Sequence, residues 1–219
     1  LHLLSRRQRQ MCIRDRINGQ GPHIDSSHIE QLMNRLRRLE SGDVLVLAGS
    51  IPAGISDNIY KDIMDMLKDK GVQIVVDATS RLLTNVLEYN PFFIKPNQHE
   101  LGDIFNVTLN TQEEVIPYAL ELKKMGAVNV CVSMGGKGAI LVADDGNVYK
   151  AKAPDGILKN SVGAGDSLVA GFLSGWIEKK DYEYAFRKGV ATGSASAFSE
   201  RLATNGEVND LIGKVTIIR

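Results

Sequence analysis

The stretch SVGAGD at residues 161–166 places two glycines and one carboxylate directly before an apolar segment with helical spacing. At a helix start the first N–H groups lack intrahelical partners, so those of Gly163, Ala164 and Gly165 could bind a phosphate. A carboxylate is repelled by that phosphate, so Asp166 suits another role, that of taking the proton from a hydroxyl that receives a phosphoryl group. The alternative is that Asp166 only caps the helix, and the motif alone leaves both interpretations open.

Two further loops carry residue types that bind polar ligands. GSIPAG at 49–54 offers the hydroxyl of Ser50, although a plain turn is an equally simple interpretation of that loop. In KPNQHE at 95–100, Asn97 is a typical helix cap, and Glu100 lies on the same side of the first helical turn. A carboxylate there can hold a hydrated Mg²⁺ that also bridges to phosphate oxygens.

A fourth loop, SMGGKG at 133–138, is rich in glycine. It is not a Walker motif, because Lys137 is followed by Gly138 and not by Ser or Thr. It can be a simple turn between two strands, or a floor on which the phosphates of a nucleotide lie close to the backbone.

The elements that must position these loops alternate between strand and helix. This alternation, with apolar strands that read as buried, predicts a doubly wound, mostly parallel α/β sheet with helices on both faces. All four loops then lie beyond the carboxyl ends of strands or at a helix start, where such sheets bind ligands. The predicted strands are 44–48, 72–78, 92–95, 128–133, 139–143 and 148–151, and the predicted helices are 27–39, 56–71, 80–88, 97–105, 111–125, 166–178 and 181–198.

Composition limits the class of protein. The 219 residues are 43% apolar and carry 26 basic against 26 acidic side chains, so no basic field for nucleic acid is expected. No apolar run is long enough for a membrane span. Cys12 and Cys131 lie far apart and no Cys or His pair has ligand spacing, which argues against zinc and indicates a reducing compartment, with the cytoplasm as the default.

The first sixteen residues, LHLLSRRQRQMCIRDR, differ from the rest. They are basic, show no clean helical period and have too short an apolar part for a signal peptide. They resemble translated adapter sequence joined to a broken reading frame, and a genuine basic arm is the alternative. We therefore expect a single domain over residues 17–219.

The motifs resemble a known family. In order along the chain they are similar to those of the ribokinase-like (phosphofructokinase B) sugar kinases, and within that family to the branch that phosphorylates fructose 1-phosphate and tagatose 6-phosphate. The resemblance runs from residue 17 to about residue 215. It is carried by KPNQHE, VSMGGKGA and NSVGAGDSLVAGF, and the branch by INGQGP, AGSIPAG and ATGSASAFSE.

The resemblance implies MgATP-dependent phosphorylation of fructose 1-phosphate to fructose 1,6-bisphosphate, and it assigns roles by position. Asp166 is implied as the catalytic base and a substrate contact, and the backbone of Gly163, Ala164 and Gly165 as the anion hole. Glu100 is implied as the residue tied to Mg²⁺, and Ser50 as a contact to the sugar phosphate. The implied ATP contacts are Lys95, Asn97, Ser133, Gly135, Gly136 and Gly138, with Ser199 near the adenine.

The front of the chain departs from the family pattern. Family members begin with a longer segment that supplies an Asp for the sugar and most of a β-sheet lid, which often forms a homodimer interface. We therefore expect the ATP half of the site to be present and much of the acceptor half and the lid to be missing. Two alternatives stay open: a tagatose-6-phosphate kinase, and an inactive fragment that only binds nucleotide.

Overall fold

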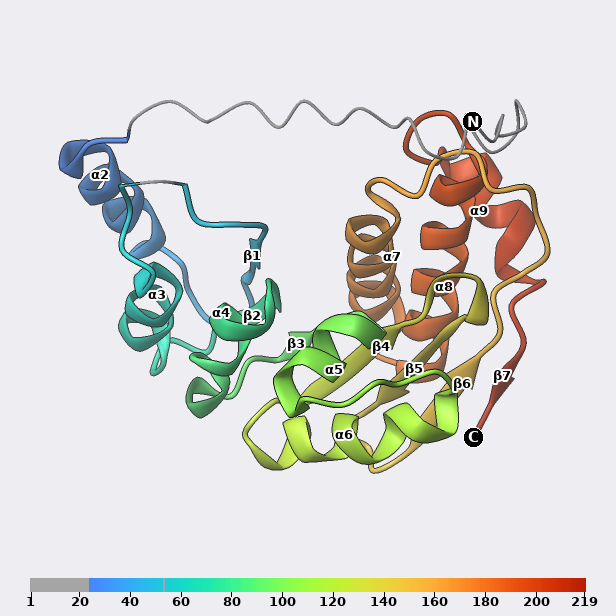
Figure 1. The fold of residues 1–219 in the computed structure, drawn as a ribbon. Helices are drawn as coiled ribbons and strands as arrows, with labels where there is room; N and C mark the ends of the chain where they lie inside the picture. The colour runs from blue at the N-terminus through green and yellow to red at the C-terminus, as the bar shows by residue number, and fades with distance from the viewer. Residues whose placement is uncertain (1–23, 53) are drawn as a thin grey trace, which may run out of the picture.

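A computed structural model describes residues 24–52 and 54–219, and these form one seven-stranded sheet whose strands lie in chain order (Figure 1). The first four strands are mutually parallel and the last three pair antiparallel. The parallel strands are β1 (Val44–Ala48), β2 (Gln73–Asp77), β3 (Phe93–Ile94) and β4 (Asn129–Ser133), and the others are β5 (Ala139–Val142), β6 (Val148–Ala151) and β7 (Ile217–Ile218). The predicted strands are therefore present, most of them one or two residues shorter.

One face of the sheet is covered by the helices that precede or connect the parallel strands. Their apolar sides meet Val76, Ile94 and Val130 in a single buried cluster. Right-handed crossovers between strands in sequential order place all their helices on the same side, which explains this layer. Its helices are α2 (Ser26–Leu36), α3 (Ile59–Leu67), α4 (Ser80–Thr84), the short η1 (Leu87–Tyr89), α5 (Gln98–Phe105) and α6 (Gln112–Lys124).

The opposite face is covered by the last three helices, α7 (Ala164–Lys179), α8 (Tyr182–Phe198) and α9 (Asn205–Ile212) (Figure 1). Phe172 of α7 stacks on Phe93 of β3 with ring centroids 4.2 Å apart, and both side chains are fully buried. Cys131 of β4 is fully buried in the same layer. Helices thus lie on both faces, and the second face is covered by helices that follow the sheet's parallel part.

Glycines let α7 and α8 approach closely. A Cβ atom added at Gly171 would lie 2.3 Å from Thr192 Oγ1, and one added at Gly193 would lie 2.9 Å from the carbonyl oxygen of Ala164. Both distances are far below van der Waals contact. The small residues of α7 and α8 therefore serve helix packing.

Two local predictions are wrong. The strand at 44–48 was expected to be buried, but Val46 is 44% exposed, because β1 is an edge strand with β2 as its only strand neighbour in the described part. For the helix at 27–39, Ser27 and Glu30 predict a capping box, but the cap is Asp25, whose carboxylate accepts the N–H of His28. The Ser27 hydroxyl donates to that same carboxylate. Asp25 is thus the better placed acceptor.

The basic segment 1–16, the INGQGP stretch and Cys12 lie outside the described residues. Within residues 24–52 and 54–219, no helix combines the length and apolar character needed to cross a membrane.

Candidate active site

The carboxyl ends of the parallel strands bring the predicted loops together. The N–H of Gly49, after β1, donates to the carbonyl of Asp77 at the end of β2 (3.0 Å). The N–H of Ser133, at the end of β4, donates to the carbonyl of Pro96 (3.2 Å), and Asn97 and Ser133 form an isolated parallel bridge. The loops after β1, β3 and β4 therefore share one edge of the sheet with the end of β2, as the sequence predicted for those three loops.

Asp166 does not cap its helix. Helix α7 begins at Ala164, and its N-cap is Gly163, which has no side chain and adopts the left-handed backbone conformation at φ 77°. Asp166 lies inside the first helical turn, three residues after the cap. The N–H of Ala164 turns back to the carbonyl of Ser161 (3.3 Å), while that of Ser167 donates to Gly163 (2.8 Å). Of the two interpretations of this motif, the capping one is wrong.

Lys95 lies at the centre of this edge. Its ammonium nitrogen is 3.1 Å from Oδ1 of Asp77, and the residue is only 5% exposed. A Cβ atom added at Gly165 would lie 3.1 Å from the same nitrogen, so the missing side chain of Gly165 is what allows the lysine to approach the start of α7. A buried cation is thus placed beside the first turn of a helix, where an anion would bind.

Asp77 is the site residue that sequence reasoning missed. Burial raises the pKa of its carboxyl, Lys95 opposes that rise, and the negative charges of Asp166 and Glu100 add to it. Lys95, Asp166 and Glu100 therefore each act electrostatically on the carboxyl of Asp77. The sequence does carry a signal for Asp77, because this residue ends an apolar strand at the edge of the sheet where ligands bind.

Asn97 and Glu100 form a complete capping box at the start of α5. The Asn97 side-chain oxygen accepts the N–H of Glu100 (3.0 Å), and Oε2 of Glu100 accepts the N–H of Asn97 (2.8 Å). Their predicted shared face is confirmed. Among the described residues no three Asp, Glu, His or Cys side chains are grouped closely enough to hold a metal ion.

The glycine-rich loop at 133–138 is a short 3₁₀ turn, η2 (Gly135–Lys137), that joins β4 to β5. Gly135 and Gly136 are exposed, and a Cβ atom added at either would meet nothing within 4 Å. Gly138 is buried at φ 91°, and a Cβ atom there would lie 2.0 Å from the carbonyl oxygen of Ala151. The loop thus has an open side at its tip and a tightly packed side at its base.

Ser199 ends α8, and its hydroxyl donates to Oε1 of Glu207 (2.7 Å). The end of α8 adjoins the start of α7, because the buried hydroxyl of Ser196 donates to that of Ser167 (2.8 Å). Ser199 therefore lies on the α7 side of the site.

Ser50 is exposed in the loop after β1. That loop is anchored by Tyr60 of α3, whose hydroxyl donates to the carbonyl of Ala48 (3.0 Å).

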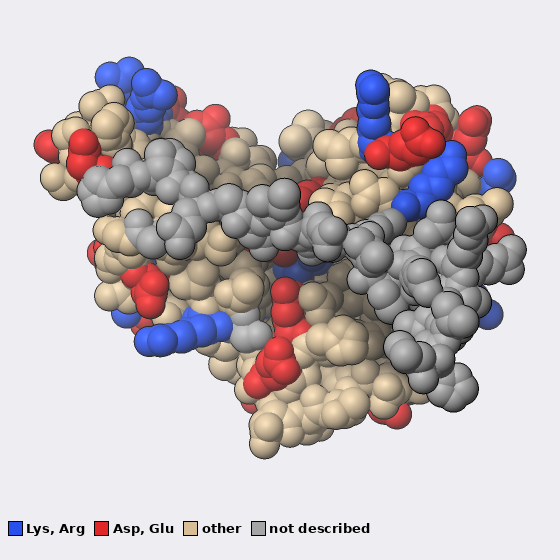
Figure 2. All heavy atoms as spheres, turned by 45° about the horizontal axis from the view of Figure 1, so that its top comes forward, with Lys and Arg blue, Asp and Glu red and all other residues tan. Residues whose placement is uncertain are grey.

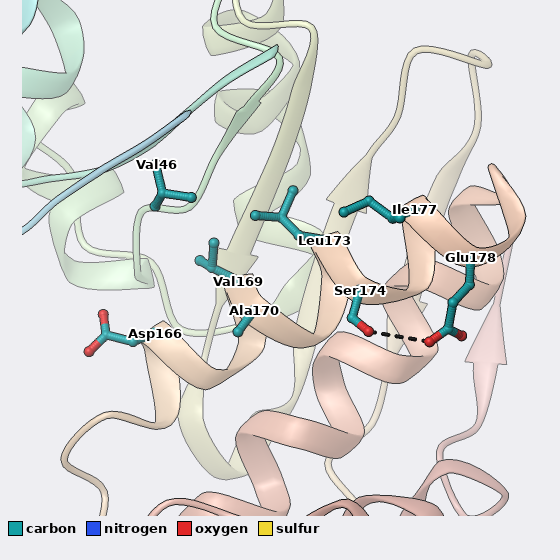
Figure 3. A pocket seen from close by; sticks show the side chains of 8 residues that line it. All are labelled: Val46, Asp166, Val169, Ala170, Leu173, Ser174, Ile177 and Glu178. Atoms are coloured by element: carbon teal, nitrogen blue, oxygen red, sulfur yellow. Dashed lines mark hydrogen bonds between the residues drawn. The ribbon is translucent and has the colours of Figure 1, made fainter. Parts of the chain in front are cut away.

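A hollow of about 630 Å³ lies between β1 and α7. Figure 3 shows Asp166 at one end of it, with Val169 and Leu173 of α7 pointing towards Val46 of β1. Its lining is mostly apolar, and Glu178, which accepts a hydrogen bond from Ser174 (3.3 Å), lines its far end. On the face drawn in Figure 2, acidic and basic side chains are interspersed, and no large patch of one sign appears.

Comparison with known proteins places this arrangement in a family. The profile of the family described as pfkB family carbohydrate kinase matches residues 14–207. The chain is 43% identical over 203 residues to the 1-phosphofructokinase of Bacillus subtilis (strain 168), a match that covers 93% of this chain and 67% of that protein. It is 30% identical over 203 residues to the D-tagatose-1-phosphate kinase of Bacillus licheniformis, covering 92% and 66%.

Solved structures give the same result. A protein from Staphylococcus aureus, crystallised as a candidate phosphofructokinase, superposes with a TM-score of 0.86 at 42% identity. The superposition covers 92% of this chain and 66% of that one. The chain therefore spans about two thirds of the length of the proteins that it matches.

Proposed function

Because the chain belongs to the pfkB family of carbohydrate kinases, we propose that it transfers the terminal phosphoryl group of MgATP to fructose 1-phosphate, giving fructose 1,6-bisphosphate. The observation that carries the proposal is the placement of Asp166, inside the first turn of α7 and not at its cap. A carboxylate in the first turn of a helix, beside a buried lysine and a glycine-lined helix start, is suited to proton transfer next to a phosphate.

In the proposed reaction, Asp166 accepts the proton of the sugar hydroxyl as the oxygen of that hydroxyl forms a bond to the terminal phosphorus. The bond from that phosphorus to the bridging oxygen breaks, and ADP leaves. Lys95 and the N–H groups at the start of α7 stabilise the charge on the transferring group. Because Lys95 is also paired with Asp77 in a buried setting, its ammonium group is held in place before the nucleotide arrives.

Glu100 would hold the magnesium ion, which neutralises charge on the phosphate oxygens when it is bound. The carboxylate of Glu100 fits such an ion, because Mg²⁺ in kinases takes one or two carboxylates and fills its remaining positions with water and phosphate.

A tagatose phosphate is the second candidate acceptor. The relative at 30% identity bears the name D-tagatose-1-phosphate kinase, and the resemblance of the motifs also includes tagatose-6-phosphate kinases. Fructose 1-phosphate is preferred because the relative named for it is the more similar, at 43% identity over the same length of alignment.

The test is ADP formation by the chain with MgATP, run without acceptor and with fructose 1-phosphate, tagatose 1-phosphate or tagatose 6-phosphate. Calorimetric titration with MgATP accompanies it. ADP that appears only with fructose 1-phosphate supports the proposal, and ADP with a tagatose phosphate alone favours the second candidate. ATP binding without ADP from any acceptor favours a chain that only binds nucleotide. A folded chain that neither binds ATP nor forms ADP contradicts the proposal.

A further inference from the structure

The side chain of Gln112, at the start of α6, joins three segments near the candidate site. Its amide nitrogen donates to the carbonyl of Lys137 in the glycine-rich loop and to the carbonyl of Ala151 at the end of β6, both at 2.9 Å. A side-chain amide carries two N–H donors, so one Gln can satisfy both carbonyls. Gln112 thus binds the loop at 133–138 to the strand on which that loop packs.

A second link runs between the same segments in the opposite direction. The ammonium group of Lys137 donates to the carbonyl of Asn110 (2.7 Å), just before α6. Asn110 is held in turn, because its N–H donates to Oε2 of Glu114 (2.7 Å). Lys137 therefore turns its charge towards the start of α6, so its visible task is to anchor the loop.

The loop needs anchoring because of its composition. Gly135 and Gly136 have open space where a side chain would be, and glycine backbone loses the most conformational freedom on being ordered. Its internal hydrogen bonds are short-range ones: the N–H of Met134 donates to Gly138, that of Lys137 to Met134, and that of Gly138 to Gly135. Bonds of this kind close a turn but do not fix where the turn lies relative to β6 and α6.

We propose that Gln112 is a positioning residue for the glycine-rich loop, and that it raises the affinity for ATP without contacting the nucleotide. The inference rests on the proposed function and on the family resemblance, which implies ATP contacts at Ser133, Gly135, Gly136 and Gly138. Gln112 acts by ordering the loop before the nucleotide arrives, so that binding does not have to bear that ordering cost.

The experiment compares wild type with Gln112→Met, which keeps the length of the side chain and removes both donors. Gln31→Met is the matched control, because Gln31 is an exposed residue of α2. We expect the dissociation constant for MgATP, measured by calorimetry, to rise roughly 3- to 10-fold in Gln112→Met, the loss that one or two net hydrogen bonds imply. The control should be unchanged.

Amide hydrogen exchange of residues 135–138, measured without nucleotide, gives a second readout that does not depend on ATP. It should become faster in Gln112→Met while the thermal midpoint stays close to that of wild type. A purely structural role would lower the midpoint and leave any change in affinity explained by unfolding. Lys137→Met should also weaken ATP binding, and the double variant should lose less than the sum, since both links hold one loop.

The outcomes separate the two proposals. If residues 135–138 exchange as slowly in Gln112→Met as in wild type, the inference is overturned, whatever the ATP affinity. It is also overturned if wild type binds ATP and Gln112→Met binds it equally tightly. If wild type binds no ATP, the proposed function fails, while faster exchange in Gln112→Met would still establish Gln112 as the anchor of the loop.

Discussion

The two ends of the same sheet edge differ in how firmly their residues are held. The donor side, defined by loops 95–100 and 133–138, rests on strands covered on both faces, and its Lys95 is 5% exposed and paired with Asp77. The acceptor side, defined by β1 and loop 49–54, has Val46 44% exposed and Ser50 exposed. Packing from both faces of the sheet thus holds a site residue in place. A site residue on an edge strand needs further contacts to hold it.

The largest expected effect falls on Asp166, in the first turn of α7. Asp166→Asn should lower turnover by roughly 10²- to 10⁴-fold, because an amide cannot accept the proton of the sugar hydroxyl. MgATP affinity should change far less, since Asp166 acts on the acceptor. Steady-state kinetics measures the turnover, in a form of the protein that is active. Asp62→Asn, in the first turn of α3, is the matched control. Near-normal turnover in Asp166→Asn would remove it from the role of base.

The next largest effect is a difference in the free energy of unfolding lost by substitutions on the two sides. Phe172→Ala should lower the free energy of unfolding by about 3–5 kcal/mol, because it empties a fully buried site stacked on Phe93. Val46→Ala should cost about 0.5 kcal/mol or less, since that side chain is half exposed. Urea unfolding measures both. If Val46→Ala lowered the free energy of unfolding as much as a core substitution does, the two sides would not differ in packing, and β1 would be covered in solution.

The proposed metal ligand can be separated from its structural role by a paired substitution. Glu100→Gln should raise the Mg²⁺ concentration needed for half-maximal rate, while glutamine still completes the capping box of α5. Glu207→Gln makes the same change in the second complete capping box, at α9, where we expect no effect on Mg²⁺. Magnesium titration of the rate measures both. Identical magnesium curves for the two variants would make Glu100 a capping residue alone.

The smallest effect is a pH dependence at Glu207. The Thr204 N–H, then the hydroxyls of Ser199 and Thr204, lower the pKa of its carboxyl to about 2, and the charge of Lys159 adds to this. A carboxyl with a lowered pKa stabilises the fold above its ordinary pKa of 4.5, and this stabilisation is lost as the pH falls from there to about 2. The difference in thermal midpoint between wild type and Glu207→Gln should therefore be constant above pH 5 and shrink below it. A difference independent of pH would contradict the assignment.

Much of this architecture could be predicted from local sequence. The strands, the cap at Asn97 and the shared face with Glu100 follow from hydrophobic period and capping chemistry, which act within a few residues. The exposure of Val46 could not be predicted, because burial depends on what lies beside a strand. Nor could the Lys95–Asp77 pair or the bonds from Gln112 to Lys137 and Ala151, since these join residues far apart in sequence.

The burial of Cys131 makes its thiol a probe of opening of the core. Its thiol is fully buried on β4, and burial raises its pKa to about 12, so almost none of it is the reactive thiolate near neutral pH. A thiol reagent can modify it only after the helices have parted from the middle of the sheet. The rate at which Cys131 is labelled under native conditions therefore reports how often the core opens. Activity measurements do not report this property.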